Sequence, residues 1–407
     1  MATGSPLLVD CEDVAWFRDQ PEAARGAAAA LGRRIGLGDQ RTAELTLAVT
    51  ELATNMTKHA VDGSLLLRVL RNREVAGVEV VAVDSGPGMA DIPAALRDGM
   101  STAGTLGIGL GAVRRLADSF DIHSQPGTGT VQLARFWPRP PHTRVAGEPA
   151  VGGITRPISG EQVCGDAWAA RTDTGEQAAP ADGALDARPA QAGAAPHGWS
   201  ALTGSRPTFE RTPPEPPRTA PLVRPGTTSR ALPVRAATPG PGQGMLVMSC
   251  DGLGHGPMAA VAAQAAVQAF RTGSSRTPEQ AVEQVHRALR GTRGAAVAVA
   301  RLEPDGRLLF CGVGNITAAL VTTTTRSTLL SHPGIVGHQM RQLRTYEHRL
   351  PPHGILVMHS DGLSERWKAA DLSSLLHHPP AVIAAGLLRH AGTRRDDASA
   401  VVAKAAW

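Results

Sequence analysis

The stretch from residue 171 to residue 243 places the strongest limit on how this chain can fold. It holds 13 of the chain's 31 prolines, together with many Ala, Gly and Thr residues, and its apolar residues follow neither a helical nor a strand period. A segment of this composition cannot bury enough apolar surface to offset the entropy lost on folding. We therefore predict a disordered insert at 171–243, with regularly patterned chain on both sides.

The chain before the insert combines helical and strand patterns. Apolar residues recur at helical spacing up to a turn at Asp62-Gly63, and two runs rich in Val and Leu then predict neighbouring strands. A glycine-rich segment leads into a second helix, and a turn at Pro126–Gly129 precedes the last strand. The predicted elements are a helix at 41–60, strands at 65–70 and 77–83, a helix at 112–120, and a strand that closes the block near Pro138.

Regular patterning resumes after the insert and predicts a second α/β block. Its predicted elements are strands at 245–249, 295–302, 308–312 and 355–359, and a helix at 257–270. The segment Cys164-Gly165-Asp166 precedes the insert but belongs with the chemistry that follows it, so the second domain is interrupted. With 407 residues, of which 42% are apolar, the chain is long enough for two domains.

One face of the first predicted helix is polar where a core-facing helix would be apolar. Glu51, Asn55 and His59 follow one another at intervals of four residues, so they project from the same face. An Asn oxygen suits Mg²⁺, which keeps water and phosphate oxygens as its other ligands, and Glu51 could take a proton from a substrate hydroxyl. Taken alone, the pattern also fits an ordinary solvated helix face.

The segment Asp84-Ser85-Gly86-Pro87-Gly88 directly follows an apolar strand pattern. A carboxylate at a strand end can accept a hydrogen bond from the exocyclic amine of adenine, and the glycines allow a turn and a close approach to the base. Farther on, Gly104–Gly111 leads into a helix whose free backbone amides can bind phosphates. A polar loop precedes Gly107, which disfavours a dinucleotide fingerprint, and the sequence contains no Walker-type phosphate loop.

Taken in order, ELATNMTKHA, DSGPG, GTLGIGLG and GTGT resemble the N, G1, G2 and G3 boxes of the GHKL ATPase/kinase superfamily. The short module and the phrase DGMSTAGTLGIGLGAVRRLADSFDI resemble the anti-sigma-factor and stressosome-switch serine/threonine kinases of the RsbT/RsbW type, over about residues 10–137. Histidine kinases share these boxes, but they need a preceding pair of dimerising helices, for which the 40 residues before Arg41 leave no room.

This resemblance implies a kinase site that uses ATP and Mg²⁺. It implies that Asn55 binds the Mg²⁺, that Glu51 is the catalytic base and that Asp84 reads the adenine, with the glycines of 104–111 under a mobile lid. The other implied ATP-binding residues are Lys58, Gly86, Gly88, Gly104, Thr105, Gly107, Gly109, Leu110, Gly111 and Thr130.

Four short phrases in the rest of the chain place an Asp beside a Gly or another Asp. They are Gly165-Asp166, Asp251-Gly252, Asp361-Gly362 and Asp396-Asp397, and two of them follow apolar strand patterns. A single Asp-Gly is usually a turn. Carboxylates gathered from several strand ends are hard ligands that suit Mg²⁺ or Mn²⁺, and two such ions can activate water against a phosphate ester.

The phrases SCDGLGHGPMAA, FCGVGN, HSDGLSE and RRDDASAVV together resemble the SpoIIE/RsbX branch of the metal-dependent (type two C) serine/threonine phosphatases, over about 148–170 and 244–404. The insert falls between the first two ligand segments, where family members have a short hairpin. His255 either shapes a turn or contacts substrate, and Asn315 is interpreted as structural. The resemblance implies metal binding by Asp166, Asp251, the Gly252 carbonyl, Asp361 and Asp396, with Asp397 as a nearby acceptor.

The expected fold class is α+β with two layered domains. We expect a GHKL ATP-binding α/β sandwich followed by an α-β-β-α sandwich of the type-two-C phosphatases, interrupted by the disordered insert. The expected division is an ATP-binding kinase domain at 1–140, the start of the phosphatase domain at 141–170, the insert at 171–243 and the rest of the phosphatase domain at 244–407.

The two resemblances together imply a bifunctional regulator: a kinase using ATP and Mg²⁺, and a phosphatase using two Mg²⁺ or Mn²⁺ ions. They imply STAS-domain anti-sigma antagonists or stressosome scaffold proteins as substrates, with a sigma factor as a further partner. Two alternatives stay open. One or both modules could bind a partner without turnover, or the first module could be a chaperone- or repair-type ATPase, which would need a long transducer domain where the phosphatase-like block lies.

The remaining composition argues against other classes of function. The net charge is +5, and the arginine pairs are scattered without interleaved aromatic residues, so a solvated surface is favoured over nucleic-acid binding. The four cysteines form no Cys-x-x-Cys pair and indicate a reducing compartment. The N-terminus lacks an export signal and no run reaches 18 apolar residues, so we expect no membrane association and a cytoplasmic protein.

Overall fold

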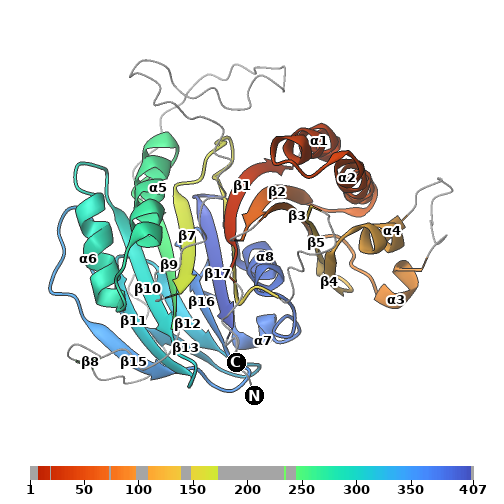
Figure 1. Cartoon of the computed structure of the whole chain (residues 1–407). Coiled ribbons are helices and arrows are strands. Elements are labelled where there is room, and N and C mark those ends of the chain that lie inside the picture. The colour runs from red at the N-terminus through yellow and green to blue at the C-terminus, as the bar shows by residue number, and fades with distance from the viewer. Residues whose placement is uncertain are drawn as a thin grey trace, which may run out of the picture.

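The helices and strands of the computed structural model form layers that follow one another across the molecule (Figure 1). We refer to the part before residue 139 as the N-terminal domain and to the part from 148 onward as the C-terminal domain. The residues that the structure describes are 8–18, 20–72, 75–97, 109–138, 148–172, 233–234 and 244–404.

The N-terminal domain is an antiparallel five-stranded sheet with helices on one face. The order in the sheet is β1-β2-β3-β5-β4. The strands are β1 (Asp10–Phe17), β2 (Ser64–Arg71), β3 (Ala76–Asp84), β4 (Ser119–Gln125) and β5 (Gly129–Phe136). The helices are the 3₁₀ turn η1 (Pro21–Ala23), α1 (Ala24–Arg34), α2 (Asp39–His59), α3 (Ile92–Ala95) and α4 (Gly109–Leu116).

The C-terminal domain packs two sheets face to face between two pairs of helices. One sheet has the order β7-β9-β10-β11-β15-β8, with β14 also paired to β11, and the other has the order β13-β12-β16-β17-β6. The helices α5 (Pro257–Thr272) and α6 (Pro278–Ala288) cover the first sheet, and α7 (Ala369–Leu372) and α8 (Pro380–Ala391) cover the second.

The strands of the first sheet are β7 (Asp166–Thr172), β8 (Pro233–Val234), β9 (Met245–Gly252), β10 (Ala295–Leu302), β11 (Arg307–Val313), β14 (Ser331–His332) and β15 (Thr345–Arg349). Those of the second are β6 (Val151–Arg156), β12 (Thr317–Val321), β13 (Arg326–Leu329), β16 (Ile355–His359) and β17 (Ala398–Lys404).

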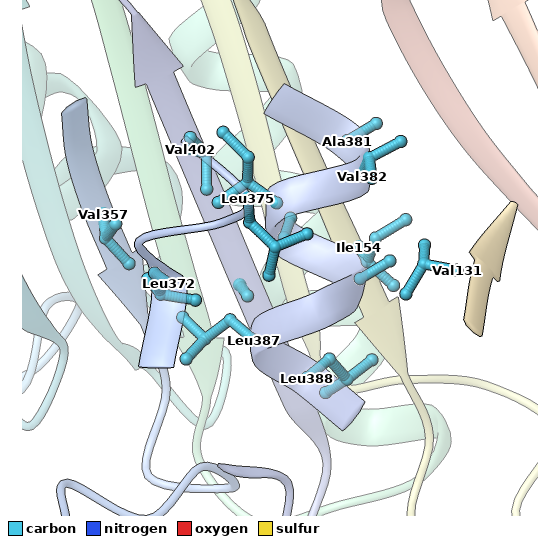
Figure 2. Packing of buried hydrophobic residues seen from close by; sticks show 14 of the residues in the cluster. Val131, Ile154, Val357, Leu372, Leu375, Ala381, Val382, Leu387, Leu388 and Val402 are labelled. Carbon is cyan, nitrogen blue, oxygen red and sulfur yellow. The ribbon is translucent and has the colours of Figure 1, made fainter. Parts of the chain in front are cut away.

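Helix α8 is shared by the two domains. One side packs on β6 and β17 of its own domain, and the other packs on the open face of the N-terminal sheet, so that Val131 and Ile154 belong to one cluster around the helix (Figure 2). Ten of its 12 residues are buried. A helix that is apolar all round is stable only inside a core, so α8 joins both domains into one packed structure.

Strand β2 is almost continuously apolar because both of its faces are buried. Leu65, Leu67 and Val69 point into the core beneath the N-terminal helices, whereas Leu66 points into the core around α8. Side chains alternate between the faces of a strand, so a sheet covered on both faces needs apolar residues at nearly every position.

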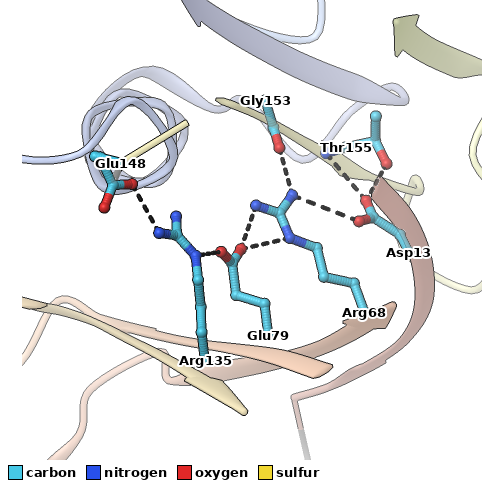
Figure 3. Close-up of polar contacts among 7 residues, drawn as sticks. All are labelled: Asp13, Arg68, Glu79, Arg135, Glu148, Gly153 and Thr155. Carbon is cyan, nitrogen blue, oxygen red and sulfur yellow. Dashed lines mark hydrogen bonds and ion pairs between the residues drawn. The ribbon is translucent and has the colours of Figure 1, made fainter. Parts of the chain in front are cut away.

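A network of buried charges also crosses between the domains (Figure 3). Glu79 lies between two guanidiniums, with Nε of Arg68 and Nε of Arg135 each 2.6 Å from one of its carboxylate oxygens. Arg135 Nη1 also donates to Glu148 Oε1 at 2.8 Å, and Arg68 donates to the carbonyl of Gly153. Buried charges need such partners, because an unpaired ion in a core is very costly.

Most predicted elements are confirmed, with differences at their ends. Helix α4 ends at Leu116, whereas the sequence analysis extended this helix to Phe120, which belongs to β4. The helix ends earlier than predicted because Phe120 pairs with Ala134 of β5 and so belongs to the sheet. The predicted insert began too early, because Arg171 and Thr172 complete β7, and Pro233–Val234 within it pairs with β15. The rest of 173–243 lies outside the described residues.

The expected α+β fold class with two layered domains is confirmed. Among the described helices, none combines the length and apolar character needed to cross a membrane.

Candidate functional site

Asp84 is the last residue of β3, one position beyond the predicted end of this strand at Val83. Its side chain is 9% exposed, and Oδ1 accepts a hydrogen bond from the backbone N–H of Gly86 at 2.7 Å. Burial raises the pKa of Asp84, and the amide of Gly86 and the charge of Arg389 act in the opposite direction. The adjoining turn therefore holds this carboxylate in one orientation.

The glycines of this turn are required by close backbone contacts. A Cβ on Gly86 would lie 2.7 Å from the carbonyl oxygen of His59, at the end of α2. Gly88 has φ +68°, and its Cβ would lie 2.0 Å from the carbonyl oxygen of Gln125. Only glycine fits such a conformation and such contacts without strain. The turn is thus clamped between α2 and the β4–β5 connection.

The polar face of α2 lies near the start of α4. Glu51 and Asn55 are half-buried, whereas Lys58 and His59 are exposed. Glu51 Oε2 accepts a hydrogen bond from the N–H of Gly109, the first residue of α4, at 3.3 Å. The structure thus brings the predicted base next to the end of the glycine-rich segment.

The other predicted nucleotide-binding residues divide into three groups. Leu110 and Gly111 are buried in α4. Thr130 is 4% exposed, lies beside Asp84 in the β3–β5 register, and shares a hydrogen bond of 2.9 Å with the hydroxyl of Ser124. Gly104, Thr105 and Gly107 lie outside the described residues.

The second predicted site forms where the two sheets of the C-terminal domain meet. Asp166 begins β7 and is directly opposite Asp251 of β9 in the strand register. Asp361 follows β16 and Asp396 precedes β17. Burial, and then the charges of Asp361 and Asp396, together raise the pKa of Asp251 to about 7. Four carboxylates from distant segments therefore act on one another here.

Asp166 is the most buried of these carboxylates, with 4% of its surface exposed. Its Oδ2 is buried and has no hydrogen-bond partner in the described part of the chain. Burial and then the charge of Asp251 raise the pKa of Asp166 well above its ordinary value. An unpaired buried oxygen beside a second carboxylate is costly without a cation to balance it.

The donor set fits hard divalent cations. No group of three His, Cys, Asp or Glu side chains in the described residues is already arranged around one point, and the carboxylates interact instead as neighbours. Mg²⁺ commonly takes one or two carboxylates and keeps several waters, so this spacing suits it. Gly252 lies at the same place, and its N–H donates to the carbonyl of Gly165 at 3.0 Å.

Asp397 holds the loop between β6 and β7. Its Oδ1 accepts from the N–H of Ile158 at 2.7 Å, and its Oδ2 accepts from the N–H of Gly165 at 2.6 Å. The side chain is 3% exposed. Both of its oxygens thus already bind backbone amides, and Asp397 fixes the segment that leads into Asp166.

The two residues whose roles the sequence left unsettled lie at this site. Asn315 Nδ2 donates to Asp361 Oδ2 at 2.7 Å, so it orients a carboxylate, although its motif was interpreted as structural. The signal that could have found it is a polar residue two positions after the end of β11 at Val313. His255 Nδ1 is 3.5 Å from Glu161 Oε1 and joins the two loops beside the acidic site.

Two family models match the chain. One, described as "Histidine kinase-like ATPase domain", matches residues 18–135, and the other, "Stage II sporulation protein E (SpoIIE)", matches residues 241–406. The serine/threonine-protein kinase RsbT of Bacillus subtilis (strain 168) is 38% identical over 117 residues, which cover 29% of this chain and 88% of RsbT. The chain belongs to the RsbT-like histidine kinase-like ATPases, fused to a SpoIIE domain.

Solved structures resemble the chain more loosely. One, from work titled "The bacterial stressosome: a modular system that has been adapted to control secondary messenger signaling", is 23% identical and covers 63% of this chain and 98% of its own, with a TM-score of 0.42. RsbX in complex with magnesium is 14% identical and covers 61% of this chain and 92% of its own, with a TM-score of 0.39.

Sequence reasoning missed the contacts that connect the RsbT-like domain to the SpoIIE domain. Arg389, in α8 of the SpoIIE domain, donates from Nη1 to the carbonyl oxygen of Asp84 at 3.5 Å. His378 Nδ1 lies 2.8 Å from Asp121 Oδ2, and His123 Nε2 lies 3.0 Å from Ser374 Oγ. These partners are far apart in the sequence and follow no motif, so only the packing of the domains reveals them.

Proposed function

We propose that the RsbT-like domain transfers the γ-phosphoryl group of ATP to serine or threonine residues of a partner protein, and that the SpoIIE domain hydrolyses phosphoserine or phosphothreonine. The observation that carries the proposal is the meeting of Asp166, Asp251, Asp361 and Asp396 from four distant segments, in a chain that also holds Asp84 at the end of β3. The membership of the RsbT-like family supports the kinase half.

In the kinase half, Asp84 binds the exocyclic amine of adenine, because its carboxylate is fixed by the Gly86 turn. Asn55, one turn from Glu51 on α2, would hold the Mg²⁺, which when bound would supply neutralisation of charge on the transferred phosphoryl group. Glu51 accepts the proton of the attacking hydroxyl. Lys58, Thr130 and the glycines from Gly104 to Gly111 complete the nucleotide site.

In the phosphatase half, Asp166, Asp251, Asp361 and Asp396, with the carbonyl of Gly252, hold two Mg²⁺ or Mn²⁺ ions, and Asp397 is the nearby acceptor. The bound ions supply a hydroxide at neutral pH and neutralise the phosphate ester. Asn315 keeps Asp361 oriented through its 2.7 Å hydrogen bond. Asp397 keeps the loop before Asp166 in place.

The proposed partners are STAS-domain proteins, either anti-sigma antagonists or stressosome scaffolds, so that the output is control of a sigma factor by partner switching. The family resemblance supports this choice. A cytoplasmic location follows from such partners and belongs to the same proposal.

The kinase half is tested by incubating the full chain with γ-labelled ATP, Mg²⁺ and a purified STAS-domain protein. We expect label on serine or threonine of the partner, and a loss of at least about a hundredfold in rate with Asn55→Ala, because positioning and charge neutralisation supply most of the catalysis. Asp39→Asn, in the first turn of α2, is the matched control. Equal labelling by Asn55→Ala would show that the assignment of this site is wrong.

The phosphatase half is tested on the same partner after it has been phosphorylated and purified. Release of phosphate should need Mg²⁺ or Mn²⁺, stop with EDTA and fall by at least about a hundredfold with Asp361→Asn. Asp305→Asn, in the turn before β11, is the control. If Asp361→Asn releases phosphate at the wild-type rate, the acidic site does not perform the hydrolysis.

A further inference from the structure

A polar pocket of about 450 Å³ lies on the seam between the two domains. The RsbT-like domain contributes the end of α2, the Asp62–Ser64 turn and Arg18 after β1. The SpoIIE domain contributes Ser159 and Gly160 from the β6–β7 loop, and Arg394 from the segment before β17. We call this cavity the seam pocket.

Three arginines gather at the seam pocket. Arg18 and Arg394 line it, and Arg156, the last residue of β6, is close enough for their charges to act on its guanidinium. Burial, and then the charges of Arg18 and Arg394, together lower the pKa of Arg156 to about 10. Only Asp62 among the described carboxylates acts on Arg156 in the opposite direction.

Arg156 carries an unsatisfied donor. Its side chain is 8% exposed, and its Nη2 is buried without a hydrogen-bond partner among the described residues. The two carboxylates that line the pocket already have partners: Asp62 forms an ion pair with Arg394, and Glu22 Oε1 accepts from Thr57 Oγ1 at 2.5 Å. A buried guanidinium among like charges is therefore left without the anion that it needs.

The ion pair across the seam pocket joins two residues with unusual backbones. Asp62 has φ +59° and Arg394 has φ +58°, and they are two of the three non-glycine residues with positive φ in the described chain. Such conformations cost free energy and persist where the surrounding structure holds them. The ion pair thus holds Arg394 at the seam, although its side chain is 43% exposed.

The seam pocket adjoins the acidic site but is separate from it. Ser159 follows Ile158, whose N–H donates to Asp397, and Arg394 precedes Asp396 by two residues. The pocket and the acidic site therefore share the segment before β7 and the segment before β17. Arginine guanidiniums match phosphate in geometry and charge, and they bind it by paired hydrogen bonds.

We propose that the seam pocket binds a phosphate dianion through Arg18 and Arg394, which line it, with the charge of the neighbouring Arg156 adding to the attraction. The phosphate is carried either on a serine or threonine of the partner protein or is the free phosphate released beside it. That choice of carrier rests on the proposed function, whereas the affinity for phosphate rests on the pocket alone. Occupancy would link the two domains, because residues of both contact the anion.

The test is isothermal titration calorimetry of the full chain with inorganic phosphate and with O-phospho-L-threonine, in EDTA and without nucleotide. EDTA leaves the acidic site without cations that could hold phosphate, so binding reports on the arginines. We expect one bound phosphate per chain, weakened at least about tenfold by Arg18→Gln or Arg394→Asn, since a hydrogen bond to a charged group contributes that much. Asn at position 394 tolerates the left-handed backbone.

Arg33→Gln, on the exposed end of α1, removes the same charge away from the pocket and is the control. Tighter binding of phosphothreonine than of phosphate assigns the site to the partner's side chain, and equal binding assigns it to the free product. No binding to the wild type, wild-type affinity in both pocket variants, or an equal loss with Arg33→Gln would overturn the proposal. The assay measures no turnover, so its failure is distinct from failure of the proposed enzymatic function.

Discussion

Glu79 is the central residue of the charge network between the domains, and it makes stability depend on pH. Burial alone would raise the pKa of Glu79, but the guanidiniums of Arg68 and Arg135 overcome this effect and lower it. A carboxylate with a lowered folded-state pKa stabilises the protein fully above its ordinary pKa of 4.5, and that contribution disappears as the pH falls through the folded value.

We predict that Glu79→Gln lowers the free energy of unfolding at pH 7 by about 3–5 kcal/mol, because it leaves two buried guanidiniums without their shared carboxylate. The difference in the free energy of unfolding between variant and wild type should shrink as the pH falls below 4.5 and through the lowered folded-state pKa, because the wild-type carboxylate then becomes protonated too. Urea unfolding at a series of pH values measures both effects.

Glu12→Gln is the matched control, since Glu12 and Arg71 form an exposed ion pair at 3.6 Å. Such a pair contributes at most about 1 kcal/mol. If Glu79→Gln costs no more than Glu12→Gln at pH 7, the network does not hold the domains together as described.

Two glycines on the same domain should respond to alanine in opposite ways. Gly88→Ala places a Cβ 2.0 Å from the Gln125 carbonyl oxygen at a positive φ, so we expect a loss of stability and of ATP affinity. Gly26 lies exposed in α1 with open space around its Cβ position, so Gly26→Ala should stabilise the protein by about 0.5–1 kcal/mol. Thermal unfolding with and without ATP measures the stability and the ATP affinity of each variant. If Gly88→Ala changes neither, the turn is not clamped as described.

Helix α8 is the element on which both domains depend. Leu387 is 0% exposed on this helix, so Leu387→Ala should cost about 2–5 kcal/mol through the cavity that it leaves. Because α8 packs on the sheets of both domains, we expect them to unfold in one shared transition at a lower urea concentration.

His390→Ala is the control on the same helix, because His390 is largely exposed and only contacts Asp371 at 3.2 Å. It should change stability by less than about 1 kcal/mol. Along the same urea series, circular dichroism follows the unfolding of the whole chain, and ATP binding follows the RsbT-like domain alone. If Leu387→Ala unfolds the SpoIIE domain while ATP binding persists, α8 does not couple the two.

Individual elements show how far sequence reasoning reaches. The strand Ala295–Leu302 and the strand Ile355–His359 were predicted at their observed bounds, because runs of Ala, Val and Leu in buried central strands leave little choice. Phe120 was placed in a helix because the apolar spacing continued from α4, and only pairing with Ala134 moves it into β4. Strand β1 has no clear pattern of its own and is defined by its pairing with β2.

On the scale of the whole molecule, the ordered motifs placed Asp84, Asp166, Asp251 and Asp361 in two separate sites, and the structure locates each at or beside a strand end. Which residues join the domains could not be predicted. Arg68, Arg389 and Arg394 take their partners from the other domain, and such contacts depend on how two finished surfaces meet rather than on local spacing.

The central claim is that one chain carries two opposed activities in separate sites. The most direct measurement follows phosphate on a STAS-domain partner through two single variants used in turn. Asp361→Asn with ATP and Mg²⁺ should phosphorylate the partner and leave it phosphorylated. After ATP is removed, Asn55→Ala with Mn²⁺ should then take the phosphate off. If Asn55→Ala still phosphorylates the partner from ATP, or if Asp361→Asn removes the phosphate as fast as the wild type, the two activities do not reside in the two sites described.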